Sequence, residues 1–358
     1  MRPSEAEAPW REKVAAAYPD PALFARSGIE QLRASLDGRG PKPPIGHLTG
    51  MGLTDIGLGT AAFSMPASSW LLSPQGLISV GTLAILADGP LGCAVQSALP
   101  PATGYATSEL SLRVLRPVRA GGTLVARASL VHASRSLALS HVQIVDDDGR
   151  LLADGSSLCF VMPPSPSSSP QPAAPPAVVP DEHNEHDPFE RPELGEVIGQ
   201  EVWDRMSGLE VLRMQLAGDL PRPPIHFLTG AGPVEVGEGL ADFSMPCHEW
   251  LCSPLRTVEG GTIAMLADDA LSSAIQTTVP PGAAFGSIDL KVNFLRPVQP
   301  DGRELLARGR VRHAGRTLAV AESEVVNADG KTVAFATGSA MILPDRPAAL
   351  RDLPEASK

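Results

Sequence analysis

The chain has 358 residues, of which 43% are hydrophobic, a composition typical of a globular protein with well-formed cores. Its net charge of −11 argues against a nucleic-acid backbone as partner, and no apolar run reaches the length of a membrane span. The N-terminus is polar, unlike a secretion signal. Four cysteines without a CxxC pair favour a reducing cytoplasm over a disulfide framework.

The first predicted element is a helix over Trp10–Leu36. Apolar residues in Ala22–Leu36 recur three and four positions apart, and Asp20-Pro21 has the form of a cap followed by a first-turn proline. Residues 1–26 are therefore expected to form an N-terminal helical extension. Asp204–Leu216 is its counterpart later in the chain.

Two copies of one unit make up most of the chain. Ser27–Pro163 matches Ser207–Pro344 with roughly 40% identity, far beyond compositional chance. A unit of about 140 residues is domain-sized, and two such units can meet about a pseudo-twofold axis, as in a homodimer. The predicted division is a first domain at 27–163, a linker at 164–195, a second domain with a leading helix at 196–344 and a tail at 345–358.

The linker is dense in proline, serine and alanine over Pro163–Pro180, which predicts an extended and poorly ordered segment. At about 3.1 Å per residue it spans roughly 50 Å, enough for the second unit to dock in any orientation. His183 and His186 follow in an acidic stretch, and we interpret them as solvated linker rather than metal ligands.

Each unit has the same predicted order of elements. A strand over Thr54–Met65 (Val234–Met245 in the second copy) is followed by an apolar helix over Val80–Ala98 (Gly260–Thr278). Four β-rich runs come next, near Tyr105–Leu115, Thr123–Ala133, Leu137–Val145 and Leu151–Val161. A helix that is apolar nearly all round is buried, so we expect an antiparallel sheet wrapped around it, an α+β fold.

A carboxylate recurs at the same position inside the apolar helix of both copies, as Asp88 and Asp268. Burial of a carboxylate is costly and shifts its pKa, which makes each residue a candidate catalytic group. The alternative is a structural aspartate bonded to neighbouring backbone or hydroxyl groups. Sequence position alone leaves both interpretations open.

The second helix begins with Glu259-Gly260-Gly261. Free N–H groups point outward at a helix start, the dipole there favours negative charge, and a glycine admits a carbonyl oxygen closely. These are the requirements of an oxyanion hole. A glycine packed against another backbone is the alternative.

The run from Glu259 to Asp268 resembles the His-Gly-Gly…Leu-x-Asp signature of hotdog-fold acyl-CoA thioesterases of the phenylacetic-acid-degradation type. Phe-Ser-Met-Pro (63–66 and 243–246) and Leu-Arg-Pro-Val (115–118 and 295–298) fit as well. The resemblance covers both repeats and implies two hotdog domains in tandem, packed as an intramolecular pseudo-dimer.

The resemblance also implies roles for individual residues. The family's nucleophile or general base falls on Asp88 and Asp268, and its oxyanion glycine falls on Gly260 in one copy and on Val80 in the other. The family histidine is replaced by Glu259 and Ser79, which departs from the pattern. The residues implied in the catalytic centre are Asp88, Asp268, Gly260, Gly261, Glu259, Val80 and Gly81.

Family sites lie at the interface between units, with glycine and carboxylate from opposite partners. One expected site pairs Gly260 with Asp88, and the other pairs Val80 with Asp268. The first has an unhindered glycine, whereas the second has a hydroxyl, Ser272, where the first has Gly92. These differences divide the favourable features between the two sites.

Candidate substrate-binding residues lie outside the helix core. Ser73 and Ser253 stand where the family usually has an amide side chain in the loop before the helix. Arginine grips phosphate in bidentate fashion, and coenzyme A carries phosphates. The arginines repeated in both copies are Arg116, Arg296, Arg135 and Arg316, for which ion pairing or a loop carbonyl is the alternative.

The resemblance implies hydrolysis of an acyl-CoA or acyl-carrier thioester without metal or organic cofactor. Two alternatives stay open: a hotdog hydratase or dehydratase, and a thioester-binding module without catalysis. A hydratase usually needs a histidine close to its aspartate, and no histidine lies near Asp88 or Asp268 in the sequence. A homodimer of the tandem chain is also possible.

Overall fold

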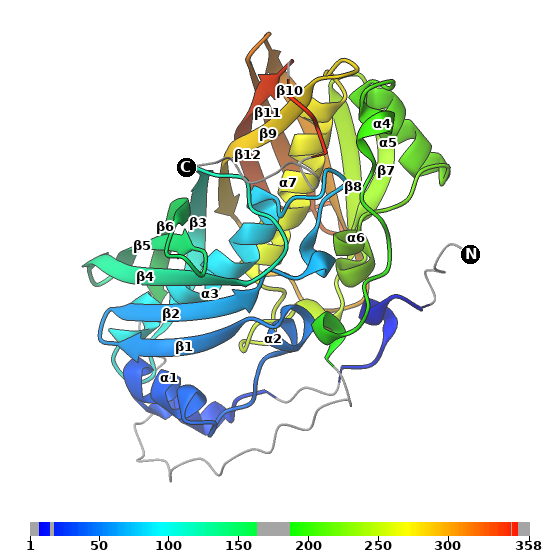
Figure 1. The fold of residues 1–358 in the computed structure, drawn as a ribbon. Helices are drawn as coiled ribbons and strands as arrows, with labels where there is room; N and C mark the ends of the chain where they lie inside the picture. The colour runs from blue at the N-terminus through cyan, green and yellow to red at the C-terminus, as the bar shows by residue number, and fades with distance from the viewer. Residues whose placement is uncertain (1–6, 15–17, 163–186, 345, 350–358) are drawn as a thin grey trace.

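The computed structural model describes residues 7–14, 18–162, 187–344 and 346–349, and the predicted linker, with His183 and His186, lies largely outside them (Figure 1). The first repeat contains η3 (Pro21–Ala25), α1 (Gly28–Leu36), α2 (Pro44–Thr49), β1 (Gly52–Gly57), β2 (Thr60–Pro66), η4 (Ser69–Leu71), α3 (Val80–Ser97), β3 (Gly104–Val114), β4 (Thr123–Ala133), β5 (Leu137–Val145) and β6 (Leu151–Met162).

The second repeat has the same series of elements after a short leading helix. They are α4 (Gln200–Trp203), α5 (Gly208–Ala217), α6 (Pro224–Thr229), β7 (Gly232–Gly237), β8 (Leu240–Pro246), η6 (Glu249–Leu251), α7 (Gly260–Gln276), β9 (Ala284–Phe294), β10 (Glu304–Ala314), β11 (Leu318–Val326) and β12 (Thr332–Leu343). Two further 3-10 turns, η2 (Pro9–Arg11) and η5 (Pro188–Glu190), precede the repeats.

The strands form one antiparallel sheet of 12 strands in the order β1-β2-β4-β5-β6-β3-β9-β12-β11-β10-β8-β7. The second half of this order mirrors the first. At the junction of β3 and β9, Ser111 lies opposite Lys291, and Lys291 is the residue of the second repeat that corresponds to Ser111. Antiparallel pairing of equivalent residues places a pseudo-twofold axis at this point. The predicted tandem hotdog is therefore confirmed.

The sheet curves around two buried helices, α3 and α7, which pack against each other at the centre of the molecule (Figure 1). Almost every side chain of α3 is buried, from Val80 to Val95, which is why the helix shows little amphipathic pattern in the sequence. Among the described residues, no helix is long and apolar enough to cross a membrane.

Two of the predicted elements are wrong in detail. The strand predicted over Thr54–Met65 is the hairpin β1–β2, because Gly59 adopts a positive φ of 75° and turns the chain. Gly239 does the same in the second repeat with a φ of 71°, between β7 and β8. The pattern of apolar residues continues across the turn and hides it.

The single helix predicted over Trp10–Leu36 is also wrong. Asp20 does cap a turn that starts at Pro21, and its side chain accepts from the Ala22 N–H at 2.8 Å. That turn is a 3-10 helix, however, and it ends at Arg26, whose backbone is extended. Ser27 then caps α1 with Glu30 in a capping box, so η3 and α1 are separate helical pieces with a break between them.

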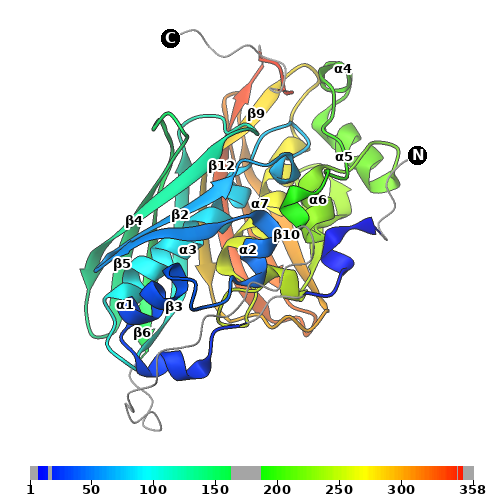
Figure 2. The same cartoon turned by 60° about the horizontal axis from the view of Figure 1, so that its bottom comes forward.

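The segments before the two repeats each pack against the other repeat. Trp250 donates its indole N–H to the Glu12 carbonyl at 2.9 Å, and Trp10 stacks on His248. In the equivalent contact, Trp70 donates to the Arg191 carbonyl at 2.8 Å. Figure 2 shows the N-terminal segment (dark blue) beside α6 of the second repeat. The two tryptophans hold these segments in place.

Candidate active site

The helices α3 and α7 are antiparallel, so the first turn of each lies beside the middle of the other. Asp88, in the middle of α3, meets Gly261 in the first turn of α7, and Asp268 meets Gly81 in the same way. Each carboxylate thus meets the helix start of the other repeat, but the hydrogen bond comes from the residue after the predicted one, Gly261 instead of Gly260 and Gly81 instead of Val80. We call the two arrangements the Asp88 site (Asp88, Glu259, Gly260 and Gly261) and the Asp268 site (Asp268, Ser79, Val80, Gly81 and Ser272).

In the Asp88 site, the Gly261 N–H donates to Asp88 Oδ2 at 3.1 Å. Burial raises the pKa of Asp88 to about 6, because the charged form loses hydration. The N–H groups of Gly261 and Gly260 oppose part of this shift, since both favour the carboxylate. Asp88 therefore exchanges its proton close to neutral pH, as a general base requires.

In the Asp268 site, the carboxylate has more hydrogen-bond donors. The Gly81 N–H donates to Asp268 Oδ2 at 2.9 Å, and the Ser272 hydroxyl donates to Oδ1 at 2.7 Å. Ser272 also lies 2.9 Å from the hydroxyl of Ser287. Burial raises the pKa of Asp268, while Ser272, Gly81 and Ser79 oppose the shift by hydrogen bonding.

The second glycine of each pair allows the helices to approach closely. A Cβ atom on Gly261 would lie 2.5 Å from the Ala84 carbonyl oxygen, and one on Gly81 would lie 2.6 Å from the Asp268 Cβ. Gly260 is different, because a Cβ there would lie 2.8 Å from the Asp88 carboxylate itself. Gly261 therefore allows the close helix contact, and its neighbour Gly260 leaves space beside the Asp88 carboxylate.

The two sites differ in exposure. Asp88 and Gly260 are both partly accessible to solvent. In contrast, Asp268 is 1% exposed and Val80 is 2% exposed. The valine stands at the position that Gly260 occupies in the other site. The Asp88 site therefore keeps some contact with solvent, while the Asp268 site is covered.

Two further residues distinguish the Asp88 site from the Asp268 site: Glu259, which belongs to it, and Tyr105, which lies near it. Glu259 is 6% exposed and its pKa is raised well above the ordinary value, first by burial and then by the charge of Asp88. Tyr105 of β3 points its hydroxyl at Gly92, where a Cβ would lie 2.4 Å from that oxygen. Tyr105 was not predicted from the sequence. The only signal for it was Gly92, which stands where the other site has Ser272 and leaves room for a larger neighbour.

The predicted substrate-binding residues lie farther from this chemistry. Arg116 donates to the Leu151 carbonyl and Arg296 to the Thr332 carbonyl. Both bonds correspond to the alternative in which the arginine binds a loop carbonyl. Arg135 and Arg316 are exposed in the turns β4–β5 and β10–β11. Phosphate binding by the arginines stays a prediction.

The two predicted serines lie in turns before the central helices. Ser253 accepts from the Leu255 N–H at 3.2 Å and so closes the turn before α7. Ser73 holds the equivalent turn before α3 through its backbone.

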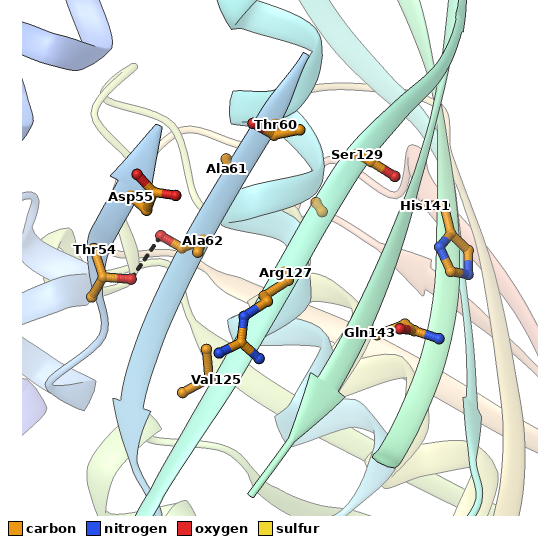
Figure 3. Close-up of a pocket in the computed structure, with 11 residues that line it drawn as sticks. Thr54, Asp55, Thr60, Ala61, Ala62, Val125, Arg127, Ser129, His141 and Gln143 are labelled. Carbon is orange, nitrogen blue, oxygen red and sulfur yellow. Dashed lines mark hydrogen bonds between the residues drawn. The ribbon is translucent and has the colours of Figure 1, made fainter. Parts of the chain in front are cut away.

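A surface pocket opens on the outer side of β1, β2, β4 and β5 in the first repeat (Figure 3). Its lining is polar in part, with Arg127, Gln143 and His141, and His141 meets Asp154 at 2.8 Å. None of the residues of the Asp88 site or the Asp268 site lines it. The pocket is therefore separate from both carboxylate sites.

Comparison with known proteins agrees with this arrangement. The thioesterase superfamily matches the chain twice, over residues 75–153 and 256–334, each match containing one of the helices and its aspartate. The acyl-coenzyme A thioesterase PaaI of Escherichia coli is 31% identical over 109 residues, which is 30% of this chain and 75% of the relative.

Two solved structures have both repeats in one chain. The tesB protein of Mycobacterium avium subspecies paratuberculosis has a TM-score of 0.51 at 15% identity, covering 84% of this chain and 98% of its own. An acyl-CoA thioesterase II of Mycobacterium marinum has a TM-score of 0.50 at 15% identity, covering 85% and 99%. At this identity the likeness concerns the fold alone.

Proposed function

Because this chain belongs to the thioesterase superfamily, we propose that it hydrolyses acyl-coenzyme A thioesters at the Asp88 site. The observation that carries the proposal is Asp88, a partly exposed residue whose carboxylate accepts a hydrogen bond from the first turn of α7 in the other repeat. Its pKa of about 6 leaves it mostly ionised at neutral pH and still basic enough to accept a proton.

The reaction needs few groups. The thioester carbonyl binds with its oxygen toward the Gly260 N–H, where the helix dipole favours the negative charge of the tetrahedral intermediate. Asp88 then attacks the carbonyl carbon, or removes a proton from a water molecule that attacks it. When Asp88 attacks, the coenzyme A thiolate leaves and takes a proton from solvent, and water then hydrolyses the acyl–aspartate anhydride to the carboxylic acid. When water attacks, the proton taken by Asp88 passes to the leaving thiolate, and the carboxylic acid forms directly.

The Asp268 site supports this chemistry less well. Val80 is buried and adds a branched side chain where Gly260 leaves space, and Asp268 is almost without solvent contact. Its hydrogen bonds to Ser272 and Gly81 match those of a structural carboxylate. We therefore assign catalysis to the Asp88 site and a structural role to Asp268.

Thiol release from a panel of acetyl-, hexanoyl-, palmitoyl- and phenylacetyl-CoA tests the proposal, with Asp88→Asn and Asp268→Asn as a matched pair. We expect Asp88→Asn to reduce kcat/KM by about 100-fold or more, the size of effect found when a proton-transfer group is removed. Asp268→Asn is expected to change it only a few-fold, in proportion to any loss of folded protein.

Other outcomes separate the alternatives. Equal small effects of the two substitutions would count against either carboxylate in catalysis. A change in double-bond absorbance without thiol release identifies a hydratase, and binding of the panel without turnover identifies a thioester-binding module. Turnover of an acyl-carrier thioester in preference to the CoA esters would correct the carrier but keep the site.

A further inference from the structure

Glu259 occupies the position directly before Gly260, and its backbone is fixed by several hydrogen bonds. Its N–H donates to the Leu251 carbonyl at 2.9 Å, and its own carbonyl accepts from the Thr262 N–H at 3.1 Å. A side chain at this position normally caps the helix, as Ser79 does on α3 by accepting from the Thr82 N–H at 3.1 Å. The Glu259 side chain does not cap α7. It is nevertheless buried, with 6% of the residue exposed.

The carboxyl group of Glu259 is left with an unused oxygen. Among the described residues, no hydrogen-bond partner is present for Oε2. The titratable groups near enough to interact electrostatically with the side chain are Asp88 and Cys93 from α3 and Tyr105 from β3. None of them is a cation, so nothing there stabilises a second negative charge. A carboxyl group in such surroundings stays protonated and then has an O–H to donate.

We propose that Glu259, as an uncharged carboxylic acid, donates a hydrogen bond to the thioester carbonyl oxygen alongside the Gly260 N–H. A Cβ on Gly260 would lie 2.8 Å from the Asp88 carboxylate, and the buried Glu259 side chain lies near enough for the charge of Asp88 to raise its pKa, so a carbonyl held between Asp88 and the start of α7 lies beside both residues. The inference rests on hydrolysis at the Asp88 site. It explains how a helix start without the family's histidine completes its oxyanion hole.

The pairing of the two acids sets an expected pH dependence. Asp88 must be ionised to act as a base, and its pKa is about 6, so the rate rises through that pH. Glu259 must be protonated to donate, so the rate falls again when Glu259 ionises at higher pH. Asp88 titrates first because its carboxylate adds to the burial that holds Glu259 protonated.

The test is the pH profile of kcat/KM for Glu259→Gln and Glu259→Ala, followed on hexanoyl-CoA by ultraviolet absorbance of the thioester. Glutamine keeps a donor and has no proton to lose, so we expect at least 10-fold more activity than with alanine, an unchanged acid limb and no alkaline limb. Alanine removes the donor and is expected to lose about 100-fold at every pH below the alkaline limb, where Glu259 of the unmodified chain is protonated. Glu249→Gln, which removes an exposed carboxylate with the same change in charge, is expected to leave both limbs in place.

Three results would overturn the inference: an alanine variant as active as the unmodified chain, a glutamine variant that keeps the alkaline limb, or a folded glutamine variant as inactive as alanine. If the alanine variant does not fold, the alkaline limb of the glutamine variant decides. Loss of activity in Asp88→Asn together with no effect at Glu259 removes this inference alone. Full activity of Asp88→Asn removes the proposed function itself.

Discussion

Replacing Asp88 by asparagine is expected to stabilise the fold while it removes activity. Burial raises the pKa of this carboxyl from 3.8 to about 6. Between these two values the folded chain keeps a proton that the unfolded chain has lost, so the free energy of unfolding falls as the pH rises from about 4 to about 6. At about 1.4 kcal/mol per pKa unit, the ionised Asp88 destabilises the protein by about 3 kcal/mol at pH 7.

Asparagine has nearly the same shape and does not ionise. Its amide oxygen still accepts from the Gly261 N–H, which Asp88 binds at 3.1 Å. We therefore expect Asp88→Asn to raise the free energy of unfolding at pH 7 by about 2–3 kcal/mol. The gain disappears at about pH 4, where the folded protein already carries protonated Asp88.

Urea denaturation at pH 7 and at pH 4 measures both values. Asp55→Asn is a matched control, because Asp55 is exposed on β1 and its replacement is expected to leave the midpoint unchanged. The reasoning is refuted if Asp88→Asn destabilises the protein at pH 7, or if it stabilises the protein equally at both pH values. Either result would mean that desolvation does not dominate at this carboxylate.

The remaining predictions concern packing. Gly261→Ala places a Cβ 2.5 Å from the Ala84 carbonyl oxygen, so we expect a loss of about 1–3 kcal/mol in urea denaturation. Gly286→Ala, where nothing lies within 4 Å, is the control, and equal midpoints for the two variants would contradict the close helix contact. Trp70→Phe removes the bond to the Arg191 carbonyl and is expected to cost about 1–2 kcal/mol. Limited proteolysis near Arg191 should then become faster, and an unchanged rate would show that this bond does not hold the segment.

The sequence by itself determined the two hotdog repeats, the central helices and the carboxylate in each. The repeats are visible because duplication left many identical residues, and the helices are visible because nearly every residue of Val80–Ser97 is buried. Asp88 and Asp268 stand out for the same reason, since a charged residue inside an apolar run has few structural explanations. Even the crossing of the two sites was predictable, through the resemblance to a dimeric family.

The tertiary structure decided how the two sites differ. The sequence already showed Val80 against Gly260 and Ser272 against Gly92, but it did not show their effect. In the folded chain Asp268 is buried and bonded to Ser272, whereas Asp88 keeps partial exposure. Exposure and hydrogen bonding depend on residues far apart in the chain, such as Tyr105 beside Gly92, and a local pattern does not contain them. The free oxygen of Glu259 likewise became visible only when its surroundings were known.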